Sequence, residues 1–237
     1  MGITERRERE RNELRRQILD AARELFAKRG YEAVTMREIA RRIEYSATAL
    51  YIHFADKETL MRELCRQDFA AFAQGFIDQV ASTGDPIARL ARAGLVYLEF
   101  AEHYPEHYRL MFMSDTPPTP PEAGEREDPA RNAYVFLHAL VSELMRNELL
   151  RSELTDIDLV AQTIWATVHG AASLEVTQRK AEQWLDFRPR NERFAAALEM
   201  GARSIARDPE AASRIVRKVL EEAEARSPAS RRIGKPE

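Results

Sequence analysis

Residues 35–60 decide the fold of this chain, and they read TMREIARRIEYSATALYIHFADKETL. Thr35 and Glu38 have the spacing of a capping box, in which each side chain binds the backbone amide of the other residue and a helix begins. A break at residues 44–46 follows, and Ser46 is a good N-cap for a second short helix. Two short helices joined by a tight turn predict a helix-turn-helix.

The contacts expected between these two helices favour the same interpretation. Ala40 is small enough to let the second helix approach closely, and three apolar side chains can clamp the pair together: Ile39, Ile43 and Leu50. The face of residues 46–53 then points outward on a short polar helix. Such a helix fits the major groove of DNA and can donate hydrogen bonds to phosphates.

A longer helix is predicted immediately before this pair. Its apolar residues recur at helical spacing, and they are Leu14, Ile18, Ala21, Ala22, Leu25 and Phe26. Gly30 occupies the position that ends a helix in the left-handed conformation. Further upstream, arginine and glutamate alternate over residues 5–16. This pattern favours a solvated helical extension with i,i+4 ion pairs, and the alternative is an arm that lies against phosphates.

The composition of the whole chain predicts an all-α protein. Among 237 residues there are only 9 glycines and 11 prolines, which leaves few turn-forming residues for a many-stranded sheet.

The net charge is −3, with +2 over residues 1–60 and −5 over the rest, so a polyanion partner is only weakly indicated. The single cysteine, Cys65, excludes an internal disulfide framework and suits a cytoplasmic protein. The uncharged stretch 159–174 is too short to span a bilayer.

Beyond residue 56 the residues that typically begin and end helices predict a second helical domain of about six helices over residues 57–226. Helix starts are indicated at Asp56, Asp85-Pro86, Pro105, Thr155 and Asp208-Pro209, and two further helices are expected over 130–150 and 191–207. Residues 114–129 are proline-rich and predict a loop, and residues 227–237 predict a disordered tail. The DNA-binding domain is expected over residues 11–56.

The helix-turn-helix and the helix before it resemble the DNA-binding domain of the TetR family of transcriptional regulators. The resemblance covers about residues 11–62 and rests on Thr35, the Ile39-Ala40 pair, the run Leu50-Tyr51-Ile52-His53-Phe54 and Lys57. It implies a homodimeric, all-helical repressor whose C-terminal domain binds a small inducer. Glu44 departs from the pattern, because the turn usually has glycine there, and a positive φ at Glu44 would cost about 1 kcal/mol.

A second resemblance concerns residues 165–170, Trp-Ala-Thr-Val-His-Gly, which look like the Trp-His-Gly motif of one type of C-terminal domain in such regulators. Trp165 and His169 share a helix face and could lie at an effector pocket. The alternative is structural: Trp165 fills the core, His169 bonds a buried partner and Gly170 permits close helix approach.

The family resemblance implies a set of DNA contacts. Tyr51, His53 and Lys57 match phosphate-binding positions, and Thr35 matches both a cap and a phosphate contact. Arg37 matches a position that reaches a base edge, where arginine commonly reads guanine. The recognition helix starts with Ser46, Ala47 and Thr48, and Ala47 could contact only a thymine methyl group. Tyr45 is interpreted as a packing residue.

Aromatic residues of the second domain predict a site for a small apolar or amphipathic effector. The candidates are Tyr97, Phe100, Tyr108, Phe112, Trp165 and His169, and the alternative is that these rings simply form the core. No metal site is expected, since Pro105 breaks the helix between His103 and His107. No cofactor is expected either.

The predicted function is therefore sequence-specific binding to a pseudo-palindromic operator in double-stranded DNA by a homodimer, without a membrane partner. The dimer contact implied by the family lies on the helices near 156–178 and 191–207, with interface or core candidates Val160, Ile164, Phe194, Leu198 and Ile205. An activator with the same domains is one alternative. Another is a helical small-molecule-binding or catalytic protein without a DNA-binding role, although no catalytic motif supports an enzyme.

Overall fold

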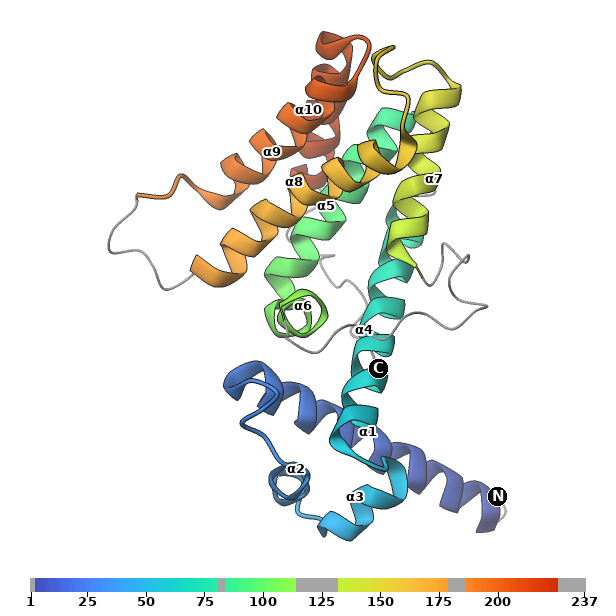
Figure 1. Ribbon diagram of the computed structural model, residues 1–237, viewed down its shortest axis with the longest axis vertical. Helices are drawn as coiled ribbons and strands as arrows, with labels where there is room; N and C mark the ends of the chain where they lie inside the picture. Colours follow the sequence, from blue (N-terminus) through green and yellow to red (C-terminus); the bar gives the residue numbers. More distant parts are fainter. Residues whose placement is uncertain (1–2, 81–83, 114–131, 179–185, 226–237) are drawn as a thin grey trace. The chain divides into compact units, whose positions relative to one another are not determined.

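The computed structural model describes residues 3–80, 84–113, 132–178 and 186–225, and within them it contains ten α-helices and no strand (Figure 1). The all-α prediction is confirmed. The helices are α1 (Ile3–Arg29), α2 (Met36–Arg42), α3 (Ala47–His53), α4 (Lys57–Val80), α5 (Pro86–His103), α6 (Pro105–Phe112), α7 (Ala133–Arg146), α8 (Ile157–Gln178), α9 (Arg190–Ile205) and α10 (Pro209–Ala225). The predicted loop 114–129 and tail 227–237 lie outside the described residues.

The chain divides into two compact units. The first contains residues 1–68 and 106–120, and the second contains residues 69–105 and 121–237. The helix α4 is continuous in sequence through the boundary at residue 68, and α6 belongs to the first unit from residue 106 onward. No described helix has the length and apolar character that a bilayer crossing requires.

The helix-turn-helix of the first unit forms as its capping residues predict. The Glu38 amide donates to Thr35 Oγ1 at 3.3 Å, and the Thr35 amide donates to Glu38 Oε2 at 2.9 Å, so the capping box is complete. Ser46 Oγ accepts a hydrogen bond from the Ala49 amide at 3.2 Å and caps α3. Ile39, Ala40 and Leu50 are buried and clamp α2 against α3.

The turn between α2 and α3 has a left-handed residue at Glu44, the position at which the family pattern usually has glycine. Glu44 has φ 62°, in the left-handed region where a side chain costs about 1 kcal/mol relative to glycine. Gly30, which ends α1, has φ 81° and the role that the sequence predicts.

The N-terminal residues continue α1 as a solvated helix. Residues 4–13 are exposed, and Arg6 pairs with Glu10 at 2.8 Å, one helical turn away. Arg16 pairs with Glu13 in the same way at 2.8 Å. The structure therefore agrees with the solvated extension that the alternating charges favoured.

In the second unit, α5 packs against four other helices: α7, α8, α9 and α10. Asp85 caps α5 through a hydrogen bond from the Ala88 amide at 2.9 Å, with Pro86 as the first helical residue. At the start of α8, Asp156 rather than Thr155 carries the cap, because its carboxylate accepts from the Leu159 amide at 3.0 Å.

Two other details of the second unit correct the sequence interpretation. Among the described glycines, it is Gly94 of α5 whose added Cβ would overlap the Leu198 side chain of α9, whereas an added Cβ at Gly170 would meet nothing within 4 Å. The helix α7 ends at Arg146 and not near residue 150, because Glu148 turns the chain with φ 53°.

Candidate nucleic-acid interface and effector site

The eight candidate DNA-contacting residues all lie in the first unit, on α2, α3, their N-caps and the first turn of α4. Five of them have exposed side chains and three are partly buried; the exposed ones are Thr35, Arg37, Ser46, Thr48 and Tyr51, and the others are Ala47, His53 and Lys57. Both α2 and α3, with their N-caps, thus have candidate side chains exposed to solvent.

The outward face of α3 carries Thr48, Tyr51 and Ile52. Leu50 is fully buried, which fixes the rotation of the helix about its axis, and Tyr51 and Ile52 are 51% and 72% exposed. Ile52 was not among the residues that the sequence singled out. In the sequence an isoleucine in a helix looks like a core residue. Only the structure shows that the Ile52 side chain is exposed.

Tyr45, in the turn before α3, is 47% exposed. Its interpretation as a packing residue is therefore wrong. Tyr45 directly follows Glu44, whose φ of 62° turns the chain between α2 and α3.

Lys57, at the start of α4, makes two contacts with the segment that follows α1. Its ammonium donates to the Tyr31 carbonyl at 2.9 Å and lies 4.0 Å from the centroid of the Tyr31 ring. Asp56 caps the same helix by accepting from the Thr59 amide at 2.6 Å. Lys57 therefore holds α4 against the rest of the unit, a role that the sequence did not predict.

His53, at the end of α3, has a pKa below its ordinary value of 6.5 because burial disfavours the charged ring and because Arg11 and Arg15 repel it. A neutral imidazole offers one N–H donor. Arg15 also donates to the His53 carbonyl at 3.4 Å, and its guanidinium lies 4.4 Å from the centroid of the Phe54 ring.

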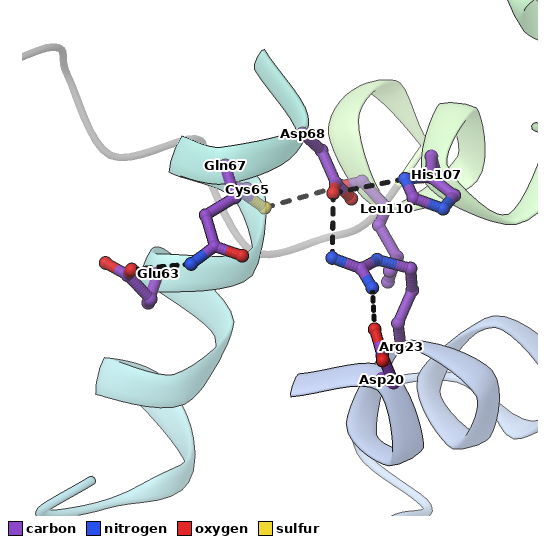
Figure 2. A network of polar contacts seen from close by, with 8 residues as sticks. All are labelled: Asp20, Arg23, Glu63, Cys65, Gln67, Asp68, His107 and Leu110. Carbon is purple, nitrogen blue, oxygen red and sulfur yellow. Dashed lines mark hydrogen bonds and ion pairs between the residues drawn. The ribbon is translucent and has the colours of Figure 1, made fainter. Parts of the chain in front are cut away.

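A buried charge cluster joins α1, α4 and α6 within the first unit (Figure 2). Asp68 is fully buried, and its Oδ1 lies 3.0 Å from Arg23 Nη2 and 3.1 Å from His107 Nδ1. Arg23 Nη1 reaches Asp20 at 2.8 Å. His107 Nδ1 therefore faces the Asp68 carboxylate, and among the described residues no group of three potential metal ligands exists.

Cys65 lies beside this cluster, buried, with its Sγ 4.0 Å from the Leu110 carbonyl oxygen. Burial, with a smaller contribution from the Asp68 charge, raises the pKa of the thiol to about 11. A thiol with that pKa is unreactive near neutral pH, in agreement with a packing role.

In the second unit, three of the candidate effector residues form a chain of hydrogen bonds. Trp165 Nε1 donates to the Tyr97 hydroxyl at 3.3 Å, and that hydroxyl lies 2.8 Å from His169 Nδ1. Burial lowers the pKa of His169, which favours the neutral ring. We therefore assign Tyr97 as donor to Nδ1, with the ring proton on Nε2.

An aromatic cluster surrounds Tyr97. Phe72 of α4 is 5.3 Å from Tyr97 and 4.6 Å from Phe100 between ring centroids, and Phe76 extends the cluster at 4.8 Å from Phe72. The sequence candidates did not include the two α4 residues, although they belong to the apolar pattern of that helix.

The six effector candidates divide between the two units. Tyr97, Phe100, Trp165 and His169 lie in the second unit. Tyr108 and Phe112 lie in the first, where Tyr108 is fully buried and the two rings are 4.9 Å apart. The structure therefore brings together Tyr97, Trp165 and His169, with Phe100 in the adjoining cluster.

Comparison with known proteins identifies both parts of the chain. Residues 18–64 match the family described as "Bacterial regulatory proteins, tetR family", and residues 90–201 match "Tetracyclin repressor-like, C-terminal domain". The chain is 31% identical over 154 residues to the HTH-type transcriptional activator FasR of Mycolicibacterium smegmatis, covering 65% of this chain and 70% of FasR. It is 34% identical to the HTH-type transcriptional repressor KstR2 of Mycobacterium tuberculosis over 44% of this chain and 51% of KstR2.

Solved structures share the fold. A TetR family transcription regulator from Marinobacter aquaeolei matches with TM-score 0.65 and 19% identity, covering 84% of this chain and 98% of that one. The ketosteroid transcriptional regulator KstR2 of Mycobacterium tuberculosis matches with TM-score 0.58 and 23% identity, covering 82% and 95%.

Proposed function

The chain belongs to the TetR family of bacterial regulatory proteins and is a helix-turn-helix transcriptional regulator, and from this premise we propose that it is a homodimeric repressor released by a small effector. The proposal places its DNA-binding domain at residues 11–56 and its regulatory domain at 57–226. It acts as a regulator rather than an enzyme, in the cytoplasm, where bacterial DNA lies.

The observation that supports operator binding most directly is the exposed surface of α2 and α3. Tyr51 and Thr48 offer hydroxyl groups to phosphates or bases, and Arg37 stands exposed on the first turn of α2. A guanidinium there can make the bidentate contact that reads guanine in the major groove.

Lys57 has two possible contributions to operator binding, and one variant separates them. If its ammonium neutralises a phosphate, Lys57→Ala reduces the slope of log K against log salt by about 0.9. If it acts only by bonding the Tyr31 carbonyl, affinity falls while the slope is unchanged.

The homodimer is supported by an uncharged, exposed face on α8 and by an exposed apolar residue on α9. Leu159 of α8 is 62% exposed and Met200 of α9 is 70% exposed, and on α8 the same face includes Ala166, Gly170 and Leu174. The open space at Gly170 would let a second chain approach closely. Of the candidates from the sequence, Val160, Phe194 and Leu198 are buried inside the chain, and Ile164 and Ile205 are partly buried.

The effector is proposed to be a small apolar or amphipathic molecule bound in the second unit. The support is the ring cluster around Tyr97, with Trp165 and His169 as polar groups that could exchange their hydrogen bonds to the Tyr97 hydroxyl for bonds to a ligand. The same two residues support assignment of this domain to the Trp-His-Gly type. Ligand and operator binding would be coupled, so each weakens the other by the same factor.

One relative favours a second candidate, because FasR is named an activator whereas KstR2 is named a repressor. A reporter gene under the selected operator separates the two directions: deletion of the regulator raises expression for a repressor and lowers it for an activator.

Selection of genomic duplexes by the purified chain tests the function itself. We expect retained sites with two half-sites whose centres are one helical turn or a multiple apart, about 34–36 Å per turn. If the chain binds no genomic duplex more tightly than scrambled DNA, the result favours the alternative of a helical ligand-binding or catalytic protein.

A further inference from the structure

The recognition helix α3 lacks the side chains that most commonly read bases. Its seven residues are Ala47-Thr-Ala-Leu-Tyr-Ile-His53, with no Arg, Lys, Asn, Gln, Asp or Glu. The bidentate pairs of arginine with guanine and of asparagine or glutamine with adenine are therefore unavailable from this helix. Discrimination by α3 must use hydroxyl groups, the partly buried His53 ring or apolar contacts.

The exposed part of α3 is rich in methyl groups. Thr48 and Ile52 lie four residues apart, so their side chains are neighbours on one face. Both are exposed, whereas Leu50 faces the core. Thr48 contributes its γ-methyl group and Ile52 its entire side chain, with the Ala47 methyl group one position before Thr48.

The exposed large apolar residues that the structure describes in the first unit lie close together in the sequence. Within the part of that unit that the structure describes, the exposed large hydrophobic residues are Tyr45, Tyr51 and Ile52, all within eight positions of the sequence. Isolated exposed apolar residues are ordinary on protein surfaces. Three together on the surface that faces the operator, in an otherwise charged domain, point to an apolar feature of the DNA.

The major groove offers one such feature, the 5-methyl group of thymine, which no other standard base carries. We propose that Ile52, together with the γ-methyl group of Thr48, determines operator specificity by packing against thymine methyl groups. This inference rests on the proposed function, and it assigns thymine to the bases under α3 and guanine to the base near Arg37.

The test replaces thymine by deoxyuridine, which removes only the methyl group. A high-affinity duplex is first selected from a random library with the full chain, and each thymine is then replaced in turn. At the contacted positions we expect affinity to fall about four-fold per methyl group, from the free energy of burying one methyl group. Placing 5-methylcytosine at a contacted position should bind more tightly than cytosine there.

Variants assign the effect to residues. In Ile52→Ala the deoxyuridine penalty at one position should disappear, and because Ile52 is exposed the variant should fold normally. Thr48→Ser removes the γ-methyl group and keeps the hydroxyl, whereas Thr48→Val does the reverse. We expect Thr48→Ser, and not Thr48→Val, to abolish the penalty at a neighbouring thymine.

The outcomes separate this inference from the proposed function. If a duplex is selected but deoxyuridine leaves its affinity unchanged, methyl reading is overturned and operator binding stands. An equal deoxyuridine penalty in Ile52→Ala and the unaltered chain overturns the role of Ile52, because the methyl group then acts through DNA shape or another residue. If no duplex is selected at all, both proposals fail.

Discussion

Asp68→Asn is expected to destabilise the first unit strongly, because it leaves the buried Arg23 guanidinium without its main counter-charge. Asparagine has nearly the same shape as aspartate, so the variant removes charge without creating a cavity. In the structure Asp68 is fully buried. Its Oδ1 lies 3.0 Å from Arg23 Nη2 and 3.1 Å from His107 Nδ1.

The magnitude follows from what remains around Arg23. Breaking a buried ion pair by removing one partner costs about 3–5 kcal/mol. Asp20 still accepts from Arg23 Nη1 at 2.8 Å, and its side chain is about half exposed, so part of the charge stays compensated. We therefore expect the lower end of that range, about 3 kcal/mol.

The matched control is Asp20→Asn, which removes the exposed partner of the same arginine. An exposed ion pair contributes at most about 1 kcal/mol, so the control should change stability by less than that. Hydrogen exchange of amides in α1, in the start of α4 and in α6 reports the opening free energy of this unit directly. Equal losses of protection in Asp68→Asn and Asp20→Asn would refute the reasoning.

Single substitutions and labelling also test the DNA contacts, the protonation of His169, the dimer face and the burial of Cys65. Tyr51→Phe should weaken binding to every duplex by a similar factor, whereas Arg37→Ala should cost about 1–3 kcal/mol at one base pair only; a uniform loss for Arg37→Ala would contradict its base-reading role. Burial lowers the pKa of folded His169 below its ordinary 6.5, so the folded state binds fewer protons and the stability of the second unit, measured by urea unfolding, should decline as the pH falls from 6.5 toward the lowered value; His169→Gln should flatten this dependence. Met200→Glu should shift the chain from dimer to monomer in sedimentation, and an unchanged dimer would exclude that face of α9 from the interface. Cys65 should react with iodoacetamide only after unfolding, and rapid labelling of the native chain would contradict its burial.

Local features of the first unit were predictable because they depend on a few adjacent residues. The capping box at Thr35 and Glu38, the cap at Ser46 and the left-handed Gly30 each require only the side chain and its neighbours within four positions. The positive φ at Glu44 was anticipated from the family resemblance, in which this turn position usually holds glycine.

Contacts between distant residues could not be predicted in the same way. Arg23 and Asp68 are 45 positions apart, and nothing in the local pattern pairs them. Gly94 rather than Gly170 accommodates a close helix because the packing of Leu198 decides the approach. The division into units also depends on contacts between distant residues. Tyr97 and Tyr108, which are near each other in the sequence, therefore belong to different units.

The central claim is that this chain recognises a specific duplex through α2 and α3. Its most direct test is the ratio of dissociation constants for the selected duplex and for a scrambled duplex of the same composition, measured at physiological salt. We predict a ratio of at least about 10³ in favour of the selected duplex, as for specific regulators. A ratio near one, with binding that follows only the salt concentration, would contradict the claim.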